Sequence, residues 1–171
     1  MLCFDVDGTL LDYGQRMPPV FNAEVIARIP VGTPVGLLTN QSGIARALAG
    51  QTRRGSTVPY PTPERFLARL RALLEYLRER RVMVEMVLVA TYNPEADPEF
   101  CELAASAVRD AGPICLVASA NPAWRKPSPR MLQLAGCSEY WGDDDTDAQA
   151  AAAAGVPFQR VPRFYKYFYE V

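Results

Sequence analysis

The sequence contains no histidine among its 171 residues. This absence excludes serine–histidine–aspartate triads, cysteine–histidine pairs and histidine-ligated zinc, because each of these sites needs an imidazole. If the protein is an enzyme, carboxylates must serve as its main proton donors and acceptors. A hard cation with oxygen ligands, such as Mg²⁺, suits this inventory better than zinc does.

Cysteine is scarce and widely spaced, at Cys3, Cys101, Cys115 and Cys137. No two of the four form a C-x-x-C pair, so the spacing favours neither a zinc site nor a disulfide framework. We therefore expect four reduced, small apolar side chains in a cytoplasmic protein.

The sequence also lacks a large excess of positive or negative charge, and it contains no long apolar run. The 18 basic and 19 acidic residues leave a net charge of −1, which gives no general attraction to nucleic acid or to an anionic membrane. No apolar run approaches the ~20 residues of a membrane span. After Met1 the chain continues directly into Leu2-Cys3-Phe4 without a basic region, so no signal peptide is expected. The length and the apolar fraction of 49% predict a single domain, 1–171, with a substantial core.

Apolar segments alternate between strand-like and helix-like spacing along the chain. Predicted strands lie at 2–4, 34–39, 84–90, 114–117 and 140–141, and predicted helices at 20–29, 44–48, 62–77, 98–111, 129–134 and 148–154. This alternation predicts βαβ units in an α/β fold of Rossmann-like type, with a mainly parallel sheet and helices on both faces. Ligands in such folds bind beyond the carboxyl ends of the strands.

Two polar segments near the N-terminus stand where predicted strands end. In the first, Asp5 and Asp7 can converge on one site, and Gly8 permits a tight turn just after them. In the second, Thr39 and Asn40 offer a hydroxyl, an amide and backbone N–H groups that suit a phosphate. Taken alone, the first segment is also consistent with an ordinary turn and the second with a helix N-cap.

Two further polar segments lie in the C-terminal half. Lys126 follows Arg125 and is one of only two lysines, so it supplies a compact ammonium charge. Asp143 and Asp147 belong to a run of carboxylates that repel one another unless they are solvated or bind a cation. A solvated lysine and the acidic first turn of a helix are the alternatives.

In this order the four segments resemble the motifs of the haloacid dehalogenase superfamily. The D-x-D-G-T motif matches residues 5–9, the strand-ending threonine is Thr39, the lysine is Lys126, and G-D-x-x-x-D matches residues 142–147. The resemblance covers residues from about 2 to 157 and implies an α/β fold of that type.

Two stretches, 39–46 and 125–129, look more narrowly like a subgroup without a large cap domain. That subgroup includes heptose bisphosphate phosphatases, histidinol-phosphate phosphatases and polynucleotide 3′-phosphatases. The heptose enzymes carry a Cys/His zinc loop before the lysine. Segment 92–124 has no histidine, so we expect an insert with its own helix in place of that loop.

The resemblance also implies roles for the acidic residues. Asp5 would be the nucleophile that forms an aspartyl phosphate, and Asp7 the general acid and base. Mg²⁺ would be held by Asp5, the backbone carbonyl of Asp7 and Asp143, with Asp147 as outer support.

The remaining motif residues would bind and orient the substrate. Thr39, Asn40 and Lys126 would bind the phosphoryl oxygens, and Lys126 would also stabilise charge during the reaction. Arg125 and Thr9 are expected to orient the substrate.

The favoured function is a phosphatase for a small phosphorylated metabolite. The alternative is a 3′-phosphatase for nucleic-acid ends, and a receiver-like or non-catalytic phospho-aspartate domain is more remote. Eight arginines between positions 53 and 81 could form a nucleic-acid groove, but a solvated helix face is favoured. The aromatic tail, 158–171, is expected to pack back on the body, although it could also stack bases or join subunits.

Overall fold

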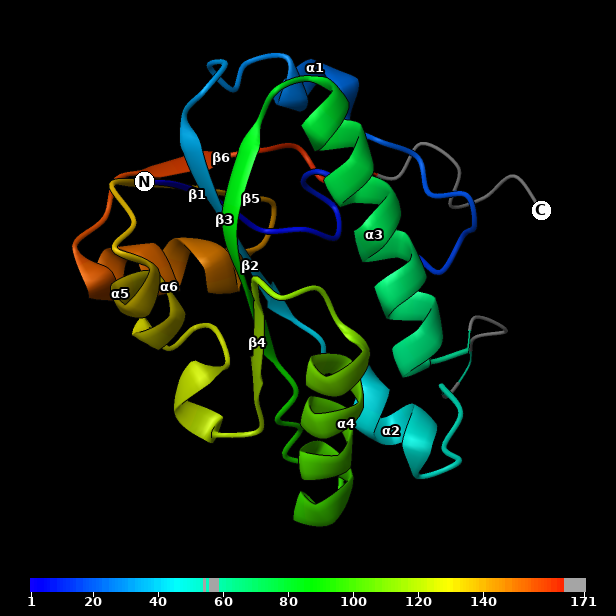
Figure 1. The fold of residues 1–171 in the computed structure, drawn as a ribbon. Helices are drawn as coiled ribbons and strands as arrows, with labels where there is room; N and C mark the ends of the chain where they lie inside the picture. Colours follow the sequence, from blue (N-terminus) through cyan, green and yellow to red (C-terminus); the bar gives the residue numbers. More distant parts are fainter. Residues whose placement is uncertain (54, 56–58, 165–171) are drawn as a thin grey trace.

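A six-stranded parallel sheet organises the computed structural model, which describes residues 1–53, 55 and 59–164. Its strands are β1 (Leu2–Phe4), β2 (Pro34–Asn40), β3 (Met83–Ala90), β4 (Leu116–Ser119), β5 (Glu139–Gly142) and β6 (Phe158–Arg160). They lie in the order β4-β3-β2-β1-β5-β6, and each neighbouring pair is parallel (Figure 1). The predicted α/β fold is confirmed.

Helices cover both faces of this sheet. They are α1 (Ala23–Ile26), α2 (Gly43–Leu48), α3 (Pro63–Glu79), α4 (Pro98–Ala111), α5 (Arg130–Ala135) and α6 (Asp145–Ala154), with a 3₁₀ turn η1 (Pro122–Trp124). In Figure 1, α3 and α4 lie on one side of the sheet and α5 and α6 on the other. The part of the chain that the structure describes contains no large cap domain, as expected.

Helix α3 shows how the sequence determines this packing. Thr62 accepts a hydrogen bond from the backbone N–H of Arg65, and Pro63 occupies the first helical position. The apolar stripe of the helix is buried and consists of Phe66, Leu67, Leu70, Leu73 and Leu77. This stripe packs in one core with Phe4 of β1 and Leu37 of β2. Neighbouring strand residues such as Leu38 point to the second core, beneath α5 and α6.

The structure differs from the predicted elements at three places. The helix expected at 20–29 is only four residues long, because Val20 instead exchanges hydrogen bonds with Asp12. The strand expected at 114–117 begins at Leu116, and Ile114 is fully exposed. Strand β6 was not predicted, since it depends on pairing with β5. The rest of the aromatic tail, 165–171, lies outside the described residues.

The expectation of four reduced cysteines is wrong for one pair. Cys3 and Cys137 form a disulfide, with Cα atoms 5.7 Å apart. They are 134 positions apart in sequence, but β1 and β5 are neighbours and Cys137 lies just before β5. Cys101 is buried and Cys115 partly buried, and both are free thiols.

No described helix is long and apolar enough to cross a membrane.

We expect the substitution Leu73→Ala to destabilise the fold, because the Leu73 side chain has no exposed surface. Removing a fully buried leucine typically costs ~2–5 kcal/mol. The matched control is Leu103→Ala on α4, where the leucine is 54% exposed and the change should stay within ~0.5 kcal/mol. Urea denaturation of both variants measures the difference, and equal effects would contradict the packing of α3 against the sheet.

Candidate active site

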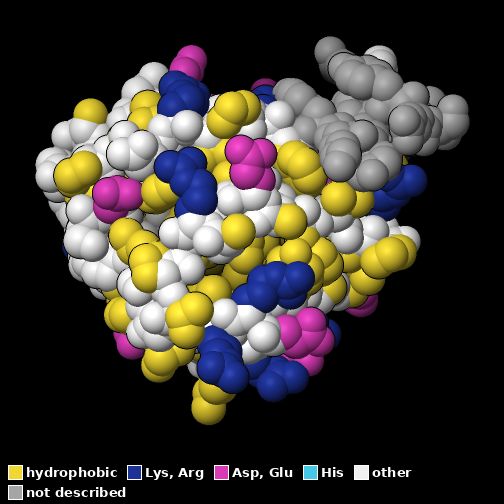
Figure 2. Space-filling view, turned by 90° about the horizontal axis from the view of Figure 1, so that it is seen from above, with side chains coloured by type: hydrophobic (Ala, Val, Ile, Leu, Met, Phe, Trp, Pro, Cys, Tyr) yellow, Lys and Arg dark blue, Asp and Glu magenta, His cyan; other side chains and the backbone are white. Residues whose placement is uncertain are grey.

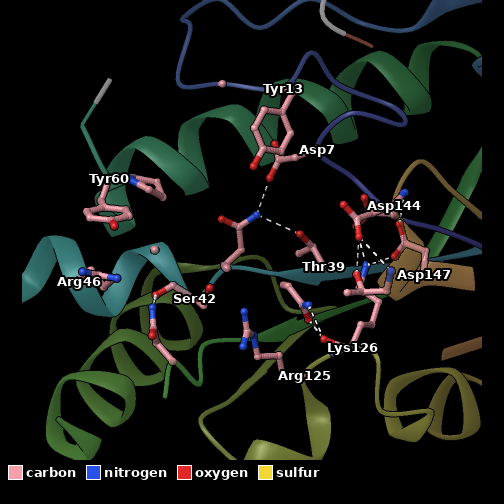
Figure 3. Close-up of a pocket in the computed structure, with 18 of the residues that line it drawn as sticks. Asp7, Tyr13, Thr39, Ser42, Arg46, Tyr60, Arg125, Lys126, Asp144 and Asp147 are labelled. Carbon is pink, nitrogen blue, oxygen red and sulfur yellow. Dashed lines mark hydrogen bonds and ion pairs between the residues drawn. The ribbon is translucent and has the colours of Figure 1, made fainter. Parts of the chain in front are cut away.

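The polar segments singled out in the sequence meet at the carboxyl edge of the sheet. Asp5 follows β1, Asn40 ends β2, Asp143 follows β5, and Lys126 lies in the loop after β4 and η1. Together they line a pocket of about 1130 Å³ (Figure 3). The order of the strands therefore joins residues more than 100 positions apart.

The ammonium of Lys126 lies at the buried end of this pocket. Its Nζ donates to Asp5 Oδ1 at 2.7 Å and to Asp147 Oδ1 at 2.6 Å. The Tyr140 hydroxyl lies 2.8 Å from Nζ and the Leu38 carbonyl 3.1 Å away. Tyr140 also donates to Asp147 Oδ1 at 2.9 Å. Lys126 is only 3% exposed, so the solvated-lysine alternative is excluded.

The environment of Lys126 keeps it charged. Burial acts to lower its pKa, but attraction from Asp5, Tyr140 and Asp147 outweighs burial and places that pKa well above its ordinary value. Burial raises the pKa of Asp5, whereas Lys126 acts to lower it. Because three oxygens lie within 2.8 Å of Nζ, we assign the charge to Lys126. A further cation near Asp5 would favour its ionised form.

Asp7 is held by two side chains to which the sequence patterns gave no role. Gln41 Nε2 donates to Asp7 Oδ2 at 2.6 Å and to Thr39 Oγ1 at 2.9 Å (Figure 3). Arg69 of α3 forms an ion pair with Asp7 Oδ1 at 3.7 Å. Burial raises the pKa of Asp7, and Arg69 and Gln41 oppose that effect. A carboxyl with a raised pKa is suited to donate a proton.

Three carboxylates form a candidate metal site. Oxygens of Asp5, Asp143 and Asp147 lie within 4.8 Å of one another. The three donors are all carboxylates, which fits a hard cation such as Mg²⁺. Both Asp147 oxygens already accept hydrogen bonds, one of them from the backbone N–H of Asp144, so Asp5 and Asp143 are the better candidates for direct ligands. The Asp7 carboxylate is not part of this cluster of described residues.

Gly8 allows the first loop to approach these carboxylates. Its φ is +82°, and a Cβ atom built on it would lie 2.6 Å from Asp143 Oδ2. Any side chain at position 8 would therefore displace Asp143 as well as strain the backbone.

Two of the residues expected to bind the phosphoryl oxygens, Thr39 and Asn40, line the pocket. The Asn40 amide donates to the Lys126 carbonyl and accepts from the Lys126 backbone N–H, so it fixes the loop that carries the lysine. Arg125 also lines the pocket, and its buried Nε has no hydrogen-bond partner among the described residues.

Thr9 differs from its expected role in orienting the substrate. Its side chain is fully buried, and its hydroxyl donates to Asp143 Oδ1 at 3.2 Å. Thr9 is not among the described residues that line the pocket. It therefore orients a carboxylate of the candidate metal site, one step removed from the substrate.

Four residues of the site were missed in the sequence, namely Gln41, Arg69, Tyr140 and Arg163. Arg163 follows β6 and pairs with Asp143 Oδ2 and Asp144 Oδ2. Arg69 was assigned to a solvated helix face, which is wrong, because it is 3% exposed. Its position on the apolar stripe, three residues after Phe66 and four before Leu73, was an available signal.

We expect Gly8→Ala to weaken cation binding by moving Asp143. The matched control is Gly50→Ala, because Gly50 also has a positive φ, +70°, but no described atom lies within 4 Å of its Cβ position. Isothermal titration with Mg²⁺ should show weaker binding only for Gly8→Ala, while both variants lose similar stability from backbone strain. Unchanged Mg²⁺ affinity in Gly8→Ala would contradict the link between position 8 and a metal-binding Asp143.

No family model matches the chain. A curated relative, the D-glycero-beta-D-manno-heptose-1,7-bisphosphate 7-phosphatase of Mesorhizobium japonicum, is 31% identical over 176 aligned positions. The alignment covers 91% of this chain and 65% of the relative, so the chain spans just under two thirds of that protein's length. The solved structure of a haloacid dehalogenase-like hydrolase from Bacteroides fragilis has 20% identity over 94% of this chain and 86% of its own. The TM-score of this comparison is 0.37.

The four motifs occur in the expected order, and the parallel sheet brings their residues together around Lys126. The similarity to the curated relative extends over nearly the whole chain. The motifs and this similarity both fit a phosphatase of the haloacid dehalogenase superfamily.

Proposed function

We propose that the protein is a Mg²⁺-dependent phosphatase that hydrolyses a phosphomonoester through an aspartyl phosphate on Asp5. The observation that carries this proposal is the hydrogen bond between the buried Lys126 ammonium and Asp5 Oδ1, in the pocket that Asp7 also lines. A fixed cation at that place stabilises negative charge on a phosphoryl group that approaches Asp5.

The residues supply the groups for a two-step reaction. An oxygen of Asp5 attacks phosphorus, the bond to the ester oxygen breaks, and Asp7 gives its proton to the departing alkoxide. Asp7, now a carboxylate, then takes a proton from water, which attacks the aspartyl phosphate and releases inorganic phosphate. When bound by Asp5 and Asp143, Mg²⁺ would reduce the repulsion between the nucleophile and the phosphate.

A small phosphorylated metabolite is the proposed substrate. The curated relative is named for a heptose bisphosphate, a small molecule of this class. The 3′-phosphatase alternative rests on the resemblance of 39–46 and 125–129 to a subgroup that includes such enzymes. The arginine-rich stretch adds little to it, because one of those arginines, Arg69, is buried. On the face in Figure 2, basic and acidic side chains are interspersed instead of gathering by sign, which gives that alternative no support there.

We expect Asp5→Asn to abolish turnover of p-nitrophenyl phosphate while the fold persists, because an amide cannot form the acyl phosphate. The rate should fall by at least ~10³-fold. The control is Asp145→Asn, whose side chain is 83% exposed and should not affect turnover. If Asp5→Asn kept near-normal activity, covalent catalysis through Asp5 would be wrong.

Removal of divalent cations by EDTA should silence the enzyme, and added Mg²⁺ should restore it, because the candidate ligands are carboxylates. Turnover of p-nitrophenyl phosphate in metal-free buffer with stepwise addition of Mg²⁺ or Zn²⁺ measures this. Recovery with Zn²⁺ but not with Mg²⁺ would overturn the assignment of an oxygen-ligated cation.

A further inference from the structure

We propose that Arg69 is a positioning residue for Asp7, and that it holds the acid–base carboxylate in the orientation that proton transfer requires. Arg69 lies on α3, which carries none of the family motifs. The inference rests on the proposed function, because it assigns a role to the group that holds Asp7.

The guanidinium of Arg69 is itself firmly anchored. Its NH2 group donates to the carbonyl of Asp12 at 2.7 Å and to Asp12 Oδ1 at 3.2 Å, and NH1 donates to the carbonyl of Arg16 at 2.6 Å. Asp12 and Arg69 are both buried. Asp12 Oδ1 also accepts from the backbone N–H of Val20. The arginine therefore connects α3 to the segment that follows the first motif.

The same NH2 group lies 3.7 Å from Asp7 Oδ1, while Gln41 holds Asp7 Oδ2. Each carboxylate oxygen of Asp7 thus faces its own donor group. Asp7 stands in a loop and its side chain is 27% exposed, so packing alone does not fix its orientation. Catalytic groups must be held within ~0.5 Å of the productive geometry, and a displacement of ~1 Å can cost ~10²-fold in rate.

Arg69 also carries the charge that balances Asp12, so it has a structural role that must be separated from the positioning role. Replacing Arg69 alone would leave the buried Asp12 carboxylate without its cation, which is strongly destabilising. The double variant Arg69→Met/Asp12→Asn removes both charges. The amide that replaces the Asp12 carboxylate would still accept the hydrogen bond from Val20 through its side-chain carbonyl.

The test compares two substrates in the double variant. An alkyl phosphate needs a proton on its leaving oxygen, whereas p-nitrophenolate departs without one. We expect kcat/KM for the alkyl phosphate to fall about 10- to 100-fold more than kcat/KM for p-nitrophenyl phosphate. The Mg²⁺ concentration for half-maximal activity should stay unchanged. The matched control is Arg65→Met, an exposed arginine on the same helix, which should alter neither rate.

An equal fall for both substrates, or no fall for either, would overturn the positioning role. Thermal unfolding of the double variant shows how much of any equal fall comes from loss of folded protein. If Asp5→Asn abolishes turnover but the ratio between substrates is unchanged in the double variant, only the role of Arg69 is wrong. If Asp5→Asn remains active, the phosphatase mechanism itself is wrong.

Discussion

The buried ammonium of Lys126 is the constraint on which the site depends. A buried cation is tolerated only when oxygens surround it, because its desolvation costs several kcal/mol. Those oxygens come from Asp5 after β1, from the Leu38 carbonyl in β2, from Tyr140 in β5 and from Asp147 in α6. One lysine therefore joins elements from both ends of the chain, and the parallel strand order is what brings them together.

In the proposed function, the same cluster provides groups for both a cation and a phosphate. Three carboxylates gather beside Lys126, and Arg163 pairs with one of them, Asp143. The site thus places the carboxylate oxygens beside two fixed hydrogen-bond donors, Lys126 and Arg163. In the proposed mechanism, a divalent cation and the ammonium share the negative charge of the carboxylates and of an incoming phosphoryl group. Thr9 and Gly8 serve this arrangement by holding or accommodating Asp143.

Local patterns predicted much of the fold, and pairings between distant segments account for what was missed. Helix α4 occupies the predicted residues, 98–111, because its periodicity and its first-position proline are local signals. Motif spacing also predicted that Asp5 and Lys126 serve one site, and the two are in contact. Strand β6 and the disulfide of Cys3 depend on neighbours chosen by the strand order. Tyr140 and Gln41 reach the site through tertiary contacts that no local pattern encodes, whereas the place of Arg69 on the apolar stripe of α3 indicated its burial but not its partner.

In the proposed mechanism the phosphoryl group is transferred to Asp5, so the mechanism can be tested by trapping the aspartyl phosphate. In Asp7→Asn the nucleophile survives but the base for the second step is lost, so the aspartyl phosphate should accumulate. We predict a burst of nitrophenolate from p-nitrophenyl phosphate, followed by slow turnover, and tandem mass spectrometry of the acid-quenched protein should place the phosphoryl group on Asp5. Steady turnover without a burst, with Asp5 unmodified and with Mg²⁺ affinity intact, would contradict a covalent intermediate on that residue.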